Sequence, residues 1–431
     1  MMTTVCTYTG SMISSAHRLF RMFGPGLVTG AADDDPSGIA TYSQSGAQFG
    51  YALSWTMFLT TPFMIAIQMM TARIGAVTGR GLAANLGKAM PATALYAMVG
   101  LLLIANTLNI AADIAAMGEA LRLVAGGPML VYVVLFGIGC LAAQILMPYH
   151  SYSKYLKLLT LVLFSYVAAA FSIRIPWGEV LTATLIPRMS WDYDFMLTLV
   201  AIFGTTISPY MFFWQASLEV EERKLRAQSG ASAASAARKR LAQRDAARIR
   251  FDTVTGMLYS NLTGFFIIVT TGATLHAHGI TQISTAEALR PFAGPLTFLL
   301  FSLGIIGTGL LAVPVLAGSA GYAVADSLGW RGSLEMPVRG APGFYLILGA
   351  ATLAGLIAAL SPFNPIRMLF WSAVVNGVVA VPLMAAMMLI VGNRRIMGAF
   401  AAPRLLMIFG WAATVLMTAV VAAMLIANLA G

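Results

Sequence analysis

The chain has 431 residues, of which 59% are hydrophobic and 10% are charged, and its mean hydropathy is +0.81. A soluble globular domain of this size does not need such a composition, so the sequence predicts a membrane protein. The net charge of +10 could indicate a nucleic-acid-binding protein, but membrane topology explains the basic residues better. We therefore expect a lipid bilayer, and no nucleic acid, as a partner.

The start of the chain, up to Arg21, lacks a clean apolar core followed by a small-residue cleavage site, so we expect no signal peptide. The two cysteines are Cys6, near the N-terminus, and Cys140, in an apolar stretch. They support neither a disulfide framework nor a zinc site. We expect both to be small apolar residues and predict no cofactor.

Hydropathy predicts eleven membrane-spanning helices. They lie at residues 22–47, 49–73, 94–124, 129–147, 155–173, 195–217, 252–276, 294–326, 343–361, 367–392 and 403–429. With the N-terminus in the cytoplasm, the segments on that side contain 21 of the 26 Lys and Arg residues. The positive-inside rule then places the C-terminus outside, in a plasma or inner membrane.

The longest polar stretch, 219–251, joins helices six and seven on the predicted cytoplasmic side. It is rich in Ala and Arg, and we expect a loop that contains a basic helix after Ser235. One interpretation of the basic residues at 223–250 is a solvated segment that sets the topology. The other is a segment that contacts anionic lipid head groups.

The first predicted helix is interrupted at residues 30–43, which read Gly-Ala-Ala-Asp-Asp-Asp-Pro-Ser-Gly-Ile-Ala-Thr-Tyr-Ser. Pro36 has no N–H to donate and Gly38 is conformationally loose, so the helix cannot continue smoothly. A charged side chain at a bilayer centre costs roughly 2.5 to 3.5 kcal/mol, so such residues usually face a cavity and a partner. Three adjacent carboxylates indicate a cation. Because consecutive helical residues point about 100° apart, at most one or two of them can face one site.

Asp35 lies directly at this break, and two interpretations of it remain open. It can cap the second half-helix, with Pro36 at the first helical position. Capping does not account for Asp33 and Asp34 beside it. The alternative is that Asp35 binds a cation at unwound backbone, which membrane proteins tolerate where it lines a cavity.

A second break is predicted in helix six, at Gly204-Thr-Thr-Ile-Ser-Pro-Tyr-Met211, where Pro209 removes a backbone hydrogen bond. If helices one to five (22–173) and six to ten (195–392) are two repeats, each break falls in the first helix of its repeat. Helix one enters the membrane from inside and helix six from outside, so the repeats are inverted, with 403–429 as an extra helix. Interrupted helices at corresponding positions of two halves are the best sequence indication of a transporter's substrate site.

These residues resemble the Nramp family of divalent-metal transporters over almost the whole chain. Asp35-Pro36-Ser37-Gly38 is similar to the family's Asp-Pro-Gly-Asn motif, and Thr205-Thr-Ile-Ser-Pro-Tyr-Met211 is similar to its Ala-x-x-Met-Pro-His-Asn motif. The resemblance implies an all-α polytopic membrane protein with the LeuT fold, two inverted five-helix repeats and an eleventh helix. It also implies that Asp35 and the carbonyl of Thr205 bind the metal ion.

The departures from the family's pattern are informative. Gly38 stands where the family has its Asn ligand, and Ser208 stands where it has its Met ligand. Tyr210 and Gln215 replace two histidines. This pattern resembles the Nramp-related magnesium transporter branch, in which a larger site takes a hydrated ion.

In helix three, Asn109-Ile-Ala-Ala-Asp113-Ile-Ala-Ala116 resembles the family's Asp-x-x-Glu motif, with Asp113 kept and the Glu lost to Ala116. Asn109 and Asp113 are four residues apart and share a helix face. They can contact the water shell of the ion or bond neighbouring helices, and the sequence does not decide between these roles. Asn376 in helix ten, beside Gly377, is expected to pack helices, with a place near the ion as the alternative.

The chemistry of the ligands agrees with this resemblance. A thioether favours softer transition metals, whereas carboxylate, carbonyl and water suit Mg²⁺ and Mn²⁺. Mg²⁺ keeps several waters around one or two carboxylates, and Ser and Gly in place of Met and Asn open room for those waters. We therefore expect the metal site to consist of Asp35, Gly38, Thr205 and Ser208. The residues expected around it are Asp34, Asn109, Asp113, Tyr210 and Asn376.

The predicted function is secondary transport of hard divalent cations, Mg²⁺ or Mn²⁺ or both, by alternating access. The partly hydrated ion is bound between the two broken helices, and transport is driven by voltage without proton coupling. The alternatives are a proton-coupled Mn²⁺ or Fe²⁺ transporter of the general Nramp type and a Na⁺-driven amino-acid symporter of the same fold. A membrane enzyme is disfavoured, because the sequence has no Gly-x-Ser-x-Gly or His-Glu-x-x-His motif and no histidine in the predicted membrane core.

Overall fold

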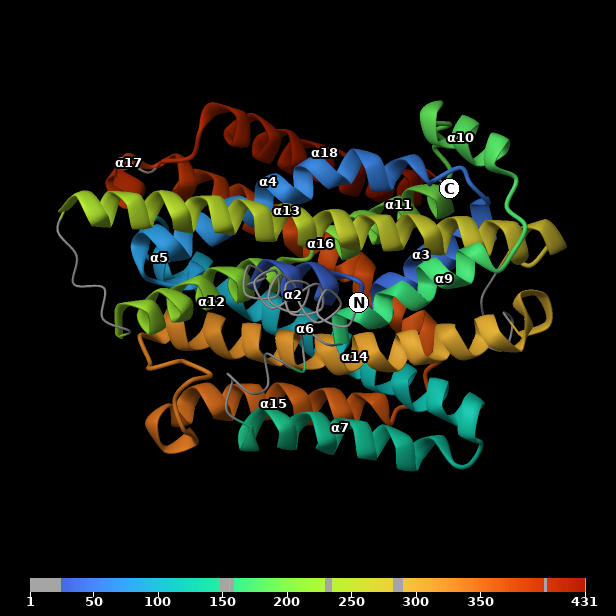
Figure 1. Ribbon diagram of the computed structural model, residues 1–431, viewed down its shortest axis with the longest axis horizontal. Helices are drawn as coiled ribbons and strands as arrows, with labels where there is room; N and C mark the ends of the chain where they lie inside the picture. Colours follow the sequence, from blue (N-terminus) through green and yellow to red (C-terminus); the bar gives the residue numbers. More distant parts are fainter. Residues whose placement is uncertain are drawn as a thin grey trace, which may run out of the picture.

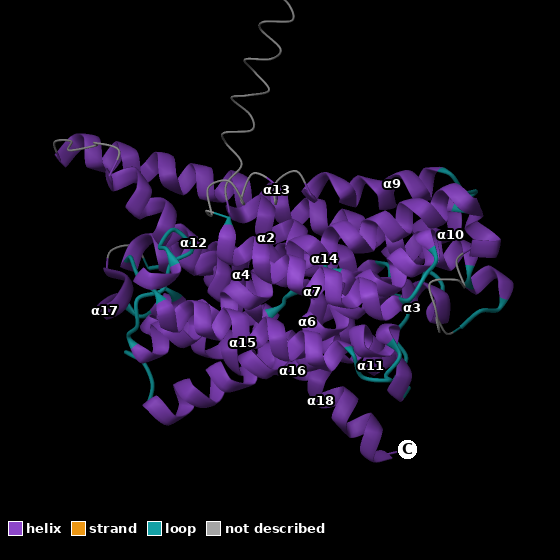
Figure 2. Cartoon of the chain, turned by 90° about the horizontal axis from the view of Figure 1, so that it is seen from below, coloured by secondary structure: helices purple, strands orange, loops and turns teal. Residues whose placement is uncertain are grey.

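The computed structural model describes residues 25–147, 155, 159–228, 235–281, 290–398 and 401–430. Within this part of the chain the regular secondary structure is helical, as predicted (Figure 2). The α-helices and the short 3₁₀ helices, labelled η, are α2 (Pro25–Asp33), α3 (Pro36–Phe49), α4 (Trp55–Thr78), α5 (Leu82–Leu86), α6 (Ala92–Ala125), α7 (Met129–Leu146), η1 (Thr160–Leu163), α9 (Phe164–Phe171), α10 (Trp177–Leu185), α11 (Tyr193–Thr206), α12 (Pro209–Gln228), α13 (Ser235–Thr274), η2 (His276–His278), α14 (Arg290–Leu328), η4 (Val338–Gly340), α15 (Pro342–Ala359), α16 (Pro365–Gly392), α17 (Arg394–Met397) and α18 (Arg404–Ala430).

Nine helical stretches among the described residues are long and apolar enough to cross a membrane, with α11 and α12 counted together. They match nine of the predicted spans. Predicted span 22–47 is divided between α2 and α3, and each half is shorter than a membrane-spanning helix. Predicted span 155–173 is described in part, as η1 and α9. The multi-pass organisation is therefore confirmed.

The segment 219–251 contains the expected basic helix, because α13 begins at Ser235. It also contains the end of α12, which continues to Gln228 and was not expected to extend so far. The Ala- and Arg-rich sequence has high helix propensity and contains no proline, so both helices extend well beyond their apolar spans.

The helices pack in two groups (Figure 1). α6, α7, α14 and α15 pack against one another, and α2, α3, α4, α12 and α13 form the second group. α16 contacts both groups, and α18 packs against α4, α11 and α16. The outer helices α7 and α18 expose large apolar side chains such as Leu146 and Leu429, as a lipid-facing surface requires.

Two pairs of glycines bring each broken helix into close contact with a neighbour. A Cβ atom added at Gly30 of α2 would clash with the backbone of Gly256 in α13. A Cβ atom added at Gly204 of α11 would clash with the backbone of Gly377 in α16. Small residues allow such close approach of helix backbones in membrane proteins. These contacts fix the place of both breaks in the bundle.

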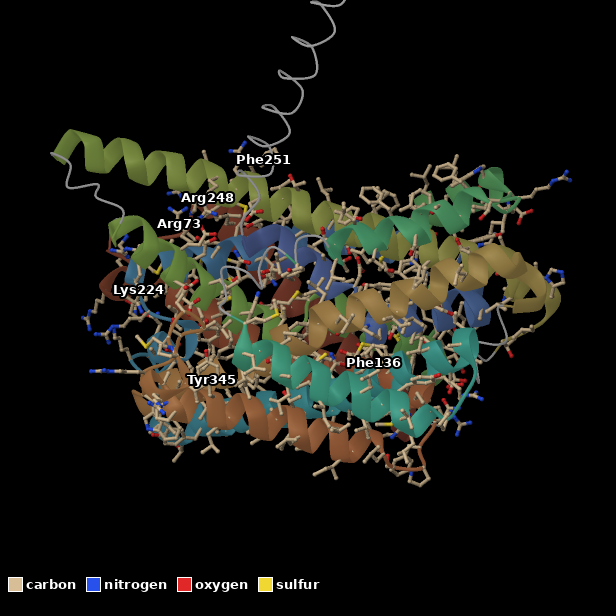
Figure 3. The ribbon with its side chains drawn as sticks, turned by 60° about the horizontal axis from the view of Figure 1, so that its bottom comes forward. Arg73, Phe136, Lys224, Arg248, Phe251 and Tyr345 are labelled. Carbon is tan, nitrogen blue, oxygen red and sulfur yellow. The ribbon has the colours of Figure 1, made fainter. Side chains whose placement is uncertain are left out.

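One end of the molecule carries several basic residues, and we call it the basic end. Arg73, Lys224 and Arg248 lie toward it (Figure 3). The short helices α5 and α17 are found at the same end, whereas α10 lies at the opposite end (Figure 1). Basic residues at one end of the spans are the pattern from which membrane orientation is inferred.

Candidate functional site

The first break lies between α2 and α3. α2 ends at Asp33, and α3 begins at Pro36, whose missing N–H suits the first position of a helix. Asp35 has extended backbone geometry, and its Oδ1 accepts a hydrogen bond from the Gly38 N–H at 2.8 Å. Asp35 is therefore the N-cap of α3, as one of its two interpretations predicts.

The other carboxylate oxygen of Asp35 is directed at two further helices. Its Oδ2 accepts a hydrogen bond from Asn109 Nδ2 of α6 at 2.7 Å. The hydroxyl of Tyr210, in α12, donates to Ala32 O at 2.6 Å and lies 3.4 Å from Asp35 Oδ2. Asp35 is 1% exposed. Capping thus uses one oxygen and leaves the other where three helices meet, so capping and ion binding are compatible roles.

Asp33 and Asp34 are fully buried and face other elements. Asp33 Oδ2 accepts a hydrogen bond from Ser260 Oγ of α13 at 2.9 Å. Asp34 also lies beside Ser260, but within the described part of the chain neither of its oxygens makes a hydrogen bond of ordinary geometry. Asp33 and Asp35 thus bond to different helices, α13 and α6, in keeping with the rotation of about 100° between consecutive helical residues.

Asp113 lies one turn after Asn109 on the same face of α6. It is fully buried, and the Ser37 backbone at the start of α3 lies beside it. Among the described residues neither of its carboxylate oxygens makes a hydrogen bond of ordinary geometry. Oδ1 of Asn109 is likewise without a partner in the described chain. This face of α6 therefore offers oxygens that a cation or its water molecules can bind.

The second break lies between α11 and α12, at Ile207 and Ser208. Ser208 Oγ is within hydrogen-bond distance of the carbonyl oxygens of Gly204 and Thr205, at 2.8 and 2.9 Å. The Thr205 carbonyl, which the resemblance assigns to the ion, accepts a hydrogen bond from Ser208 in this structure. Thr205 and Ser208 are both 1% exposed.

The two breaks meet where Gly38 faces Thr205. A Cβ atom added at Gly38 would lie 2.8 Å from Thr205 Oγ1. The open room expected beside Gly38 is therefore not present in this structure, because the Thr205 side chain occupies it. Thr205 itself replaces the Ala of the related motif. The related motifs have the larger Asn at the position of Gly38 and the smaller Ala at the position of Thr205. In this chain the larger residue is the one in the second break.

Most of the predicted site residues form one connected set through the contacts described above. They are Asp35, Gly38, Asn109, Thr205, Ser208 and Tyr210. Asp113 lies next to this set, one turn after Asn109 on α6. Asp34 and Asn376 are buried, but no hydrogen bond among the described residues joins them to the set. Ser260 was not predicted from the sequence. A hydroxyl side chain within an apolar span is the feature that could have indicated it.

The carboxylates at the breaks have no basic partner among the described residues, whereas other carboxylates do, such as Glu119 with Arg122 and Glu219 with Arg248. In the same part of the chain, no three His, Cys, Asp or Glu side chains lie close enough to hold a metal ion. A cation here would be bound by one or two carboxylates together with neutral oxygens and water. Such an all-oxygen set suits hard divalent ions.

The chain matches the family model described as natural resistance-associated macrophage protein-like, Nramp, over residues 26–427. It is 26% identical over 401 residues to the divalent metal cation transporter MntH of Verminephrobacter eiseniae, covering 89% of this chain and 84% of that protein. It is 25% identical over 400 residues to MntH of Erwinia tasmaniensis, covering 91% of this chain and 90% of that protein.

Two solved structures have a similar arrangement of helices. The manganese transporter of Eremococcus coleocola, in complex with an aromatic bis-isothiourea substituted compound, has a TM-score of 0.72 at 16% identity and covers 92% of this chain and 84% of its own. Mhp1, a nucleobase-cation-symport-1 family transporter, has a TM-score of 0.50 at 12% identity and covers 94% of this chain and 92% of its own. At these identities the similarity concerns the fold.

Proposed function

The chain belongs to the Nramp family, and from this membership we propose that it transports hard divalent cations, Mg²⁺ or Mn²⁺ or both. It is a multi-pass membrane transporter of divalent metal cations with the LeuT fold, and it is not an enzyme. The observation that supports the preference for hard ions is the oxygen-rich set around Asp35. Ser208 contributes a hydroxyl to this set where the related motif has a thioether.

The proposed ion position is beside Asp35 Oδ2, between the two breaks. Asp35, Gly38, Thr205 and Ser208 are the proposed metal-site residues. We assign the ion's water molecules to the oxygens around it, above all Asn109 Oδ1 and the carboxylate of Asp113, which are buried and make no hydrogen bond of ordinary geometry in the described chain. The wider proposed surroundings are Asp34, Tyr210 and Asn376.

We propose that the basic end faces the cytoplasm, with the N-terminus on that side and the C-terminus outside. The segments 22–173 and 195–392 are then the inverted repeats, and 403–429 is the eleventh helix. The basic residues of 223–250, in and between α12 and α13, are proposed to lie at the membrane surface next to anionic lipid head groups.

We propose that inward transport is driven by the membrane potential. A dication that moves inward gains roughly 4.6 kcal/mol per 100 mV, enough for about a thousandfold accumulation without a second ion. Histidine titrates near neutral pH and is a common proton carrier. Both described histidines, His276 and His278, lie in η2 and not at the breaks. Tyr210 and Gln215 occupy the positions of the histidines in the related motif.

The test is uptake into proteoliposomes that contain a pH-sensitive dye, under an inward Mg²⁺ or Mn²⁺ gradient and a potassium-clamped potential. We expect uptake of both ions to follow voltage without acidification of the lumen. Acidification in proportion to ion flux would contradict the voltage-driven mechanism and favour the proton-coupled Mn²⁺ or Fe²⁺ alternative. Stabilisation by an amino acid and Na⁺, and not by Mg²⁺ or Mn²⁺, would favour the symporter alternative.

The substitution Asn109→Leu is expected to weaken the apparent affinity for the ion by about ten- to a hundredfold, because a hydrogen bond to a charged group contributes about 1.5 to 3 kcal/mol. It removes both the donor to Asp35 and the proposed acceptor for the ion's water. The measurement is the concentration of Mg²⁺ or Mn²⁺ that gives half-maximal thermal stabilisation of the purified protein.

Asn106→Leu is the matched control for this measurement. Asn106 is equally buried on α6, but it donates to Leu316 O and Ser319 Oγ of α14. Its loss should lower the melting temperature without changing the affinity for the ion. If the two substitutions weaken the affinity for the ion equally, Asn109 is not part of the ion site.

A further inference from the structure

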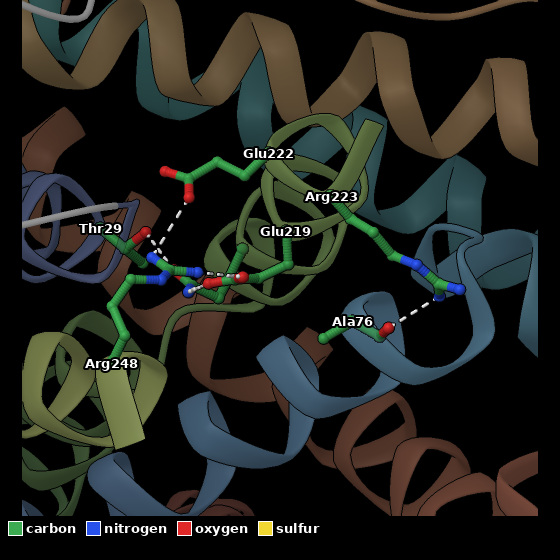
Figure 4. A network of polar contacts seen from close by, with 7 residues as sticks. Thr29, Ala76, Glu219, Glu222, Arg223 and Arg248 are labelled. Atoms are coloured by element: carbon green, nitrogen blue, oxygen red, sulfur yellow. Dashed lines mark hydrogen bonds and ion pairs between the residues drawn. The ribbon is translucent and has the colours of Figure 1, made fainter. Parts of the chain in front are cut away.

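A chain of polar side chains joins α2 to α12 and α13 (Figure 4). Its member Arg248 lies toward the basic end (Figure 3). Thr29 Oγ1 donates to Gln215 Oε1 at 2.6 Å, and Gln215 Nε2 donates to Glu219 Oε1 at 3.3 Å. Arg248 of α13 donates to Glu219 Oε2 at 2.9 Å and pairs with Glu222 at 3.3 Å. We call these five residues the Glu219 network.

The charges at the centre of the Glu219 network are largely removed from water. The exposed fraction is 2% for the Glu219 side chain and 16% for Arg248. A buried charge needs its partner, because the other side chain would otherwise remain charged and unpaired. The pair of Arg122 and Glu119, at the far end of α6, is more exposed, with fractions of 40% and 14%. Burial makes the Glu219 network sensitive to the position of the helices around it.

The position of α2 depends on α12 and α13. α2 is divided from α3 by the first break. Gly30 lies against the backbone of Gly256 in α13, and the hydroxyl of Tyr210 in α12 donates to Ala32 O. Thr29 connects this same helix to the Glu219 network. The network therefore joins α2 to α12 and α13, the two helices from which α2 must separate in order to move.

The carboxylates at the breaks are shielded from water in this structure. Asp33, Asp34, Asp35 and Asp113 are at most 1% exposed. Transport requires the site to open to each side in turn, so an element that covers it must move. Movement of α2 away from α12 and α13 would admit water to the Glu219 network. An ion pair in water contributes little to stability, so the pair favours the closed position.

We propose that Arg248 and Glu219 are positioning residues of the transport cycle, which hold α2 against α12 and α13 and keep the ion site closed at the basic end. They do not touch the ion. They act through Gln215 and Thr29, and the ion site opens at the basic end when this connection is broken. Thr29→Val therefore weakens closure although it leaves both charges in place.

The test measures how often α2 moves away, with a thiol as the reporter. The two native cysteines, Cys6 and Cys140, are replaced by alanine. Ala31→Cys then adds a single thiol on α2, at a position that is 0% exposed. The rate of labelling by a small maleimide is measured on the full-length protein in lipid nanodiscs, without metal.

We expect Arg248→Ala and Thr29→Val each to raise the labelling rate about tenfold, the factor that corresponds to losing one hydrogen bond of ordinary strength. Arg248→Lys keeps the charge and should raise the rate less. Arg122→Ala breaks an ion pair far from α2 and is the matched control, with an unchanged rate. If Arg248→Ala does not fold, Thr29→Val and Arg248→Lys decide the question, because neither leaves a buried charge without a partner.

Mn²⁺ uptake by the same variants gives a second measurement. A shift in the position of α2 changes kcat and KM together, whereas a purely structural role lowers the amount of folded protein and leaves KM unchanged. Labelling rates equal to those of the parent protein in Thr29→Val and in the folded Arg248 variants would overturn the proposal. Because labelling is measured without metal, its outcome does not depend on which ion the protein carries.

Discussion

Asp35→Asn is expected to lower divalent-metal uptake by about 100-fold or more, while the protein still folds and inserts. Removing one partner of a buried charge interaction costs about 3 to 5 kcal/mol, and the ion would lose the carboxylate at the break. Asparagine keeps a side-chain oxygen that can accept the Gly38 N–H, so the cap of α3 is retained. The measurement is Mg²⁺ and Mn²⁺ uptake into proteoliposomes with equal amounts of folded protein.

Two further substitutions separate capping from ion binding. Asp35→Ala removes the cap as well as the charge, so it should abolish uptake and lower stability by about 1 kcal/mol in addition. Asp192→Asn alters a different N-cap, since Asp192 precedes α11 outside the site and accepts the Asp194 N–H at 3.2 Å. It should leave uptake unchanged. Near-normal uptake by the Asp35→Asn protein would show that the ion binds elsewhere.

Three substitutions together at the breaks are expected to shift the preference from Mg²⁺ toward Mn²⁺ by about tenfold. Ser208→Met introduces a thioether, which favours softer ions, and reduces the space for water around the ion. Gly38→Asn supplies an amide oxygen. Its Cβ would lie 2.8 Å from Thr205 Oγ1, so Thr205→Ala must accompany it. Competition between the two ions in an uptake assay measures the ratio.

The contact between Gly38 and Thr205 provides the controls. Gly38→Asn alone should reduce uptake of both ions, because the Thr205 side chain must be displaced. Adding Thr205→Ala should restore uptake, and a double-mutant cycle measures this coupling. If the triple variant is active and its ratio of Mn²⁺ to Mg²⁺ uptake is unchanged, these positions do not line the ion site.

Both breaks could be predicted from the sequence because their causes are local. Pro36 and Pro209 each remove a backbone hydrogen bond, and α3 and α12 begin at these two residues. The membrane spans could be predicted for a similar reason, since an apolar run long enough to cross a bilayer is a property of one segment. The N-cap role of Asp35 also follows from its neighbours in the chain.

Contacts between distant segments could not be predicted in this way. Asn109 and Asp35 are 74 residues apart, and their hydrogen bond depends on how α6 packs against the break. The sequence presents Gly38 and Thr205 as two independent departures from the related motif. Packing alone relates them, because the side chain of one residue fills the space left by the other.

The burial of Glu219 could not be predicted from the sequence either, and the reason is different. Glu219 and Arg248 belong to a stretch rich in charged residues, which is typical of a solvated segment. Their burial depends on the extension of α12 and α13 beyond the apolar spans and on the position of α2. No local pattern in the sequence distinguishes Glu219 and Arg248 from the other charged residues of this stretch.

The two roles of Asp35 couple helix order to ion occupancy. One oxygen of the carboxylate accepts the Gly38 N–H in the first turn of α3, and the other is at the proposed ion position. By linkage, if an ordered first turn of α3 increases the affinity for the ion, the bound ion stabilises the ordered turn by the same free energy. The state that releases the ion should then have a less ordered first turn, and amide hydrogen exchange at Gly38 should be slowest when the ion is bound.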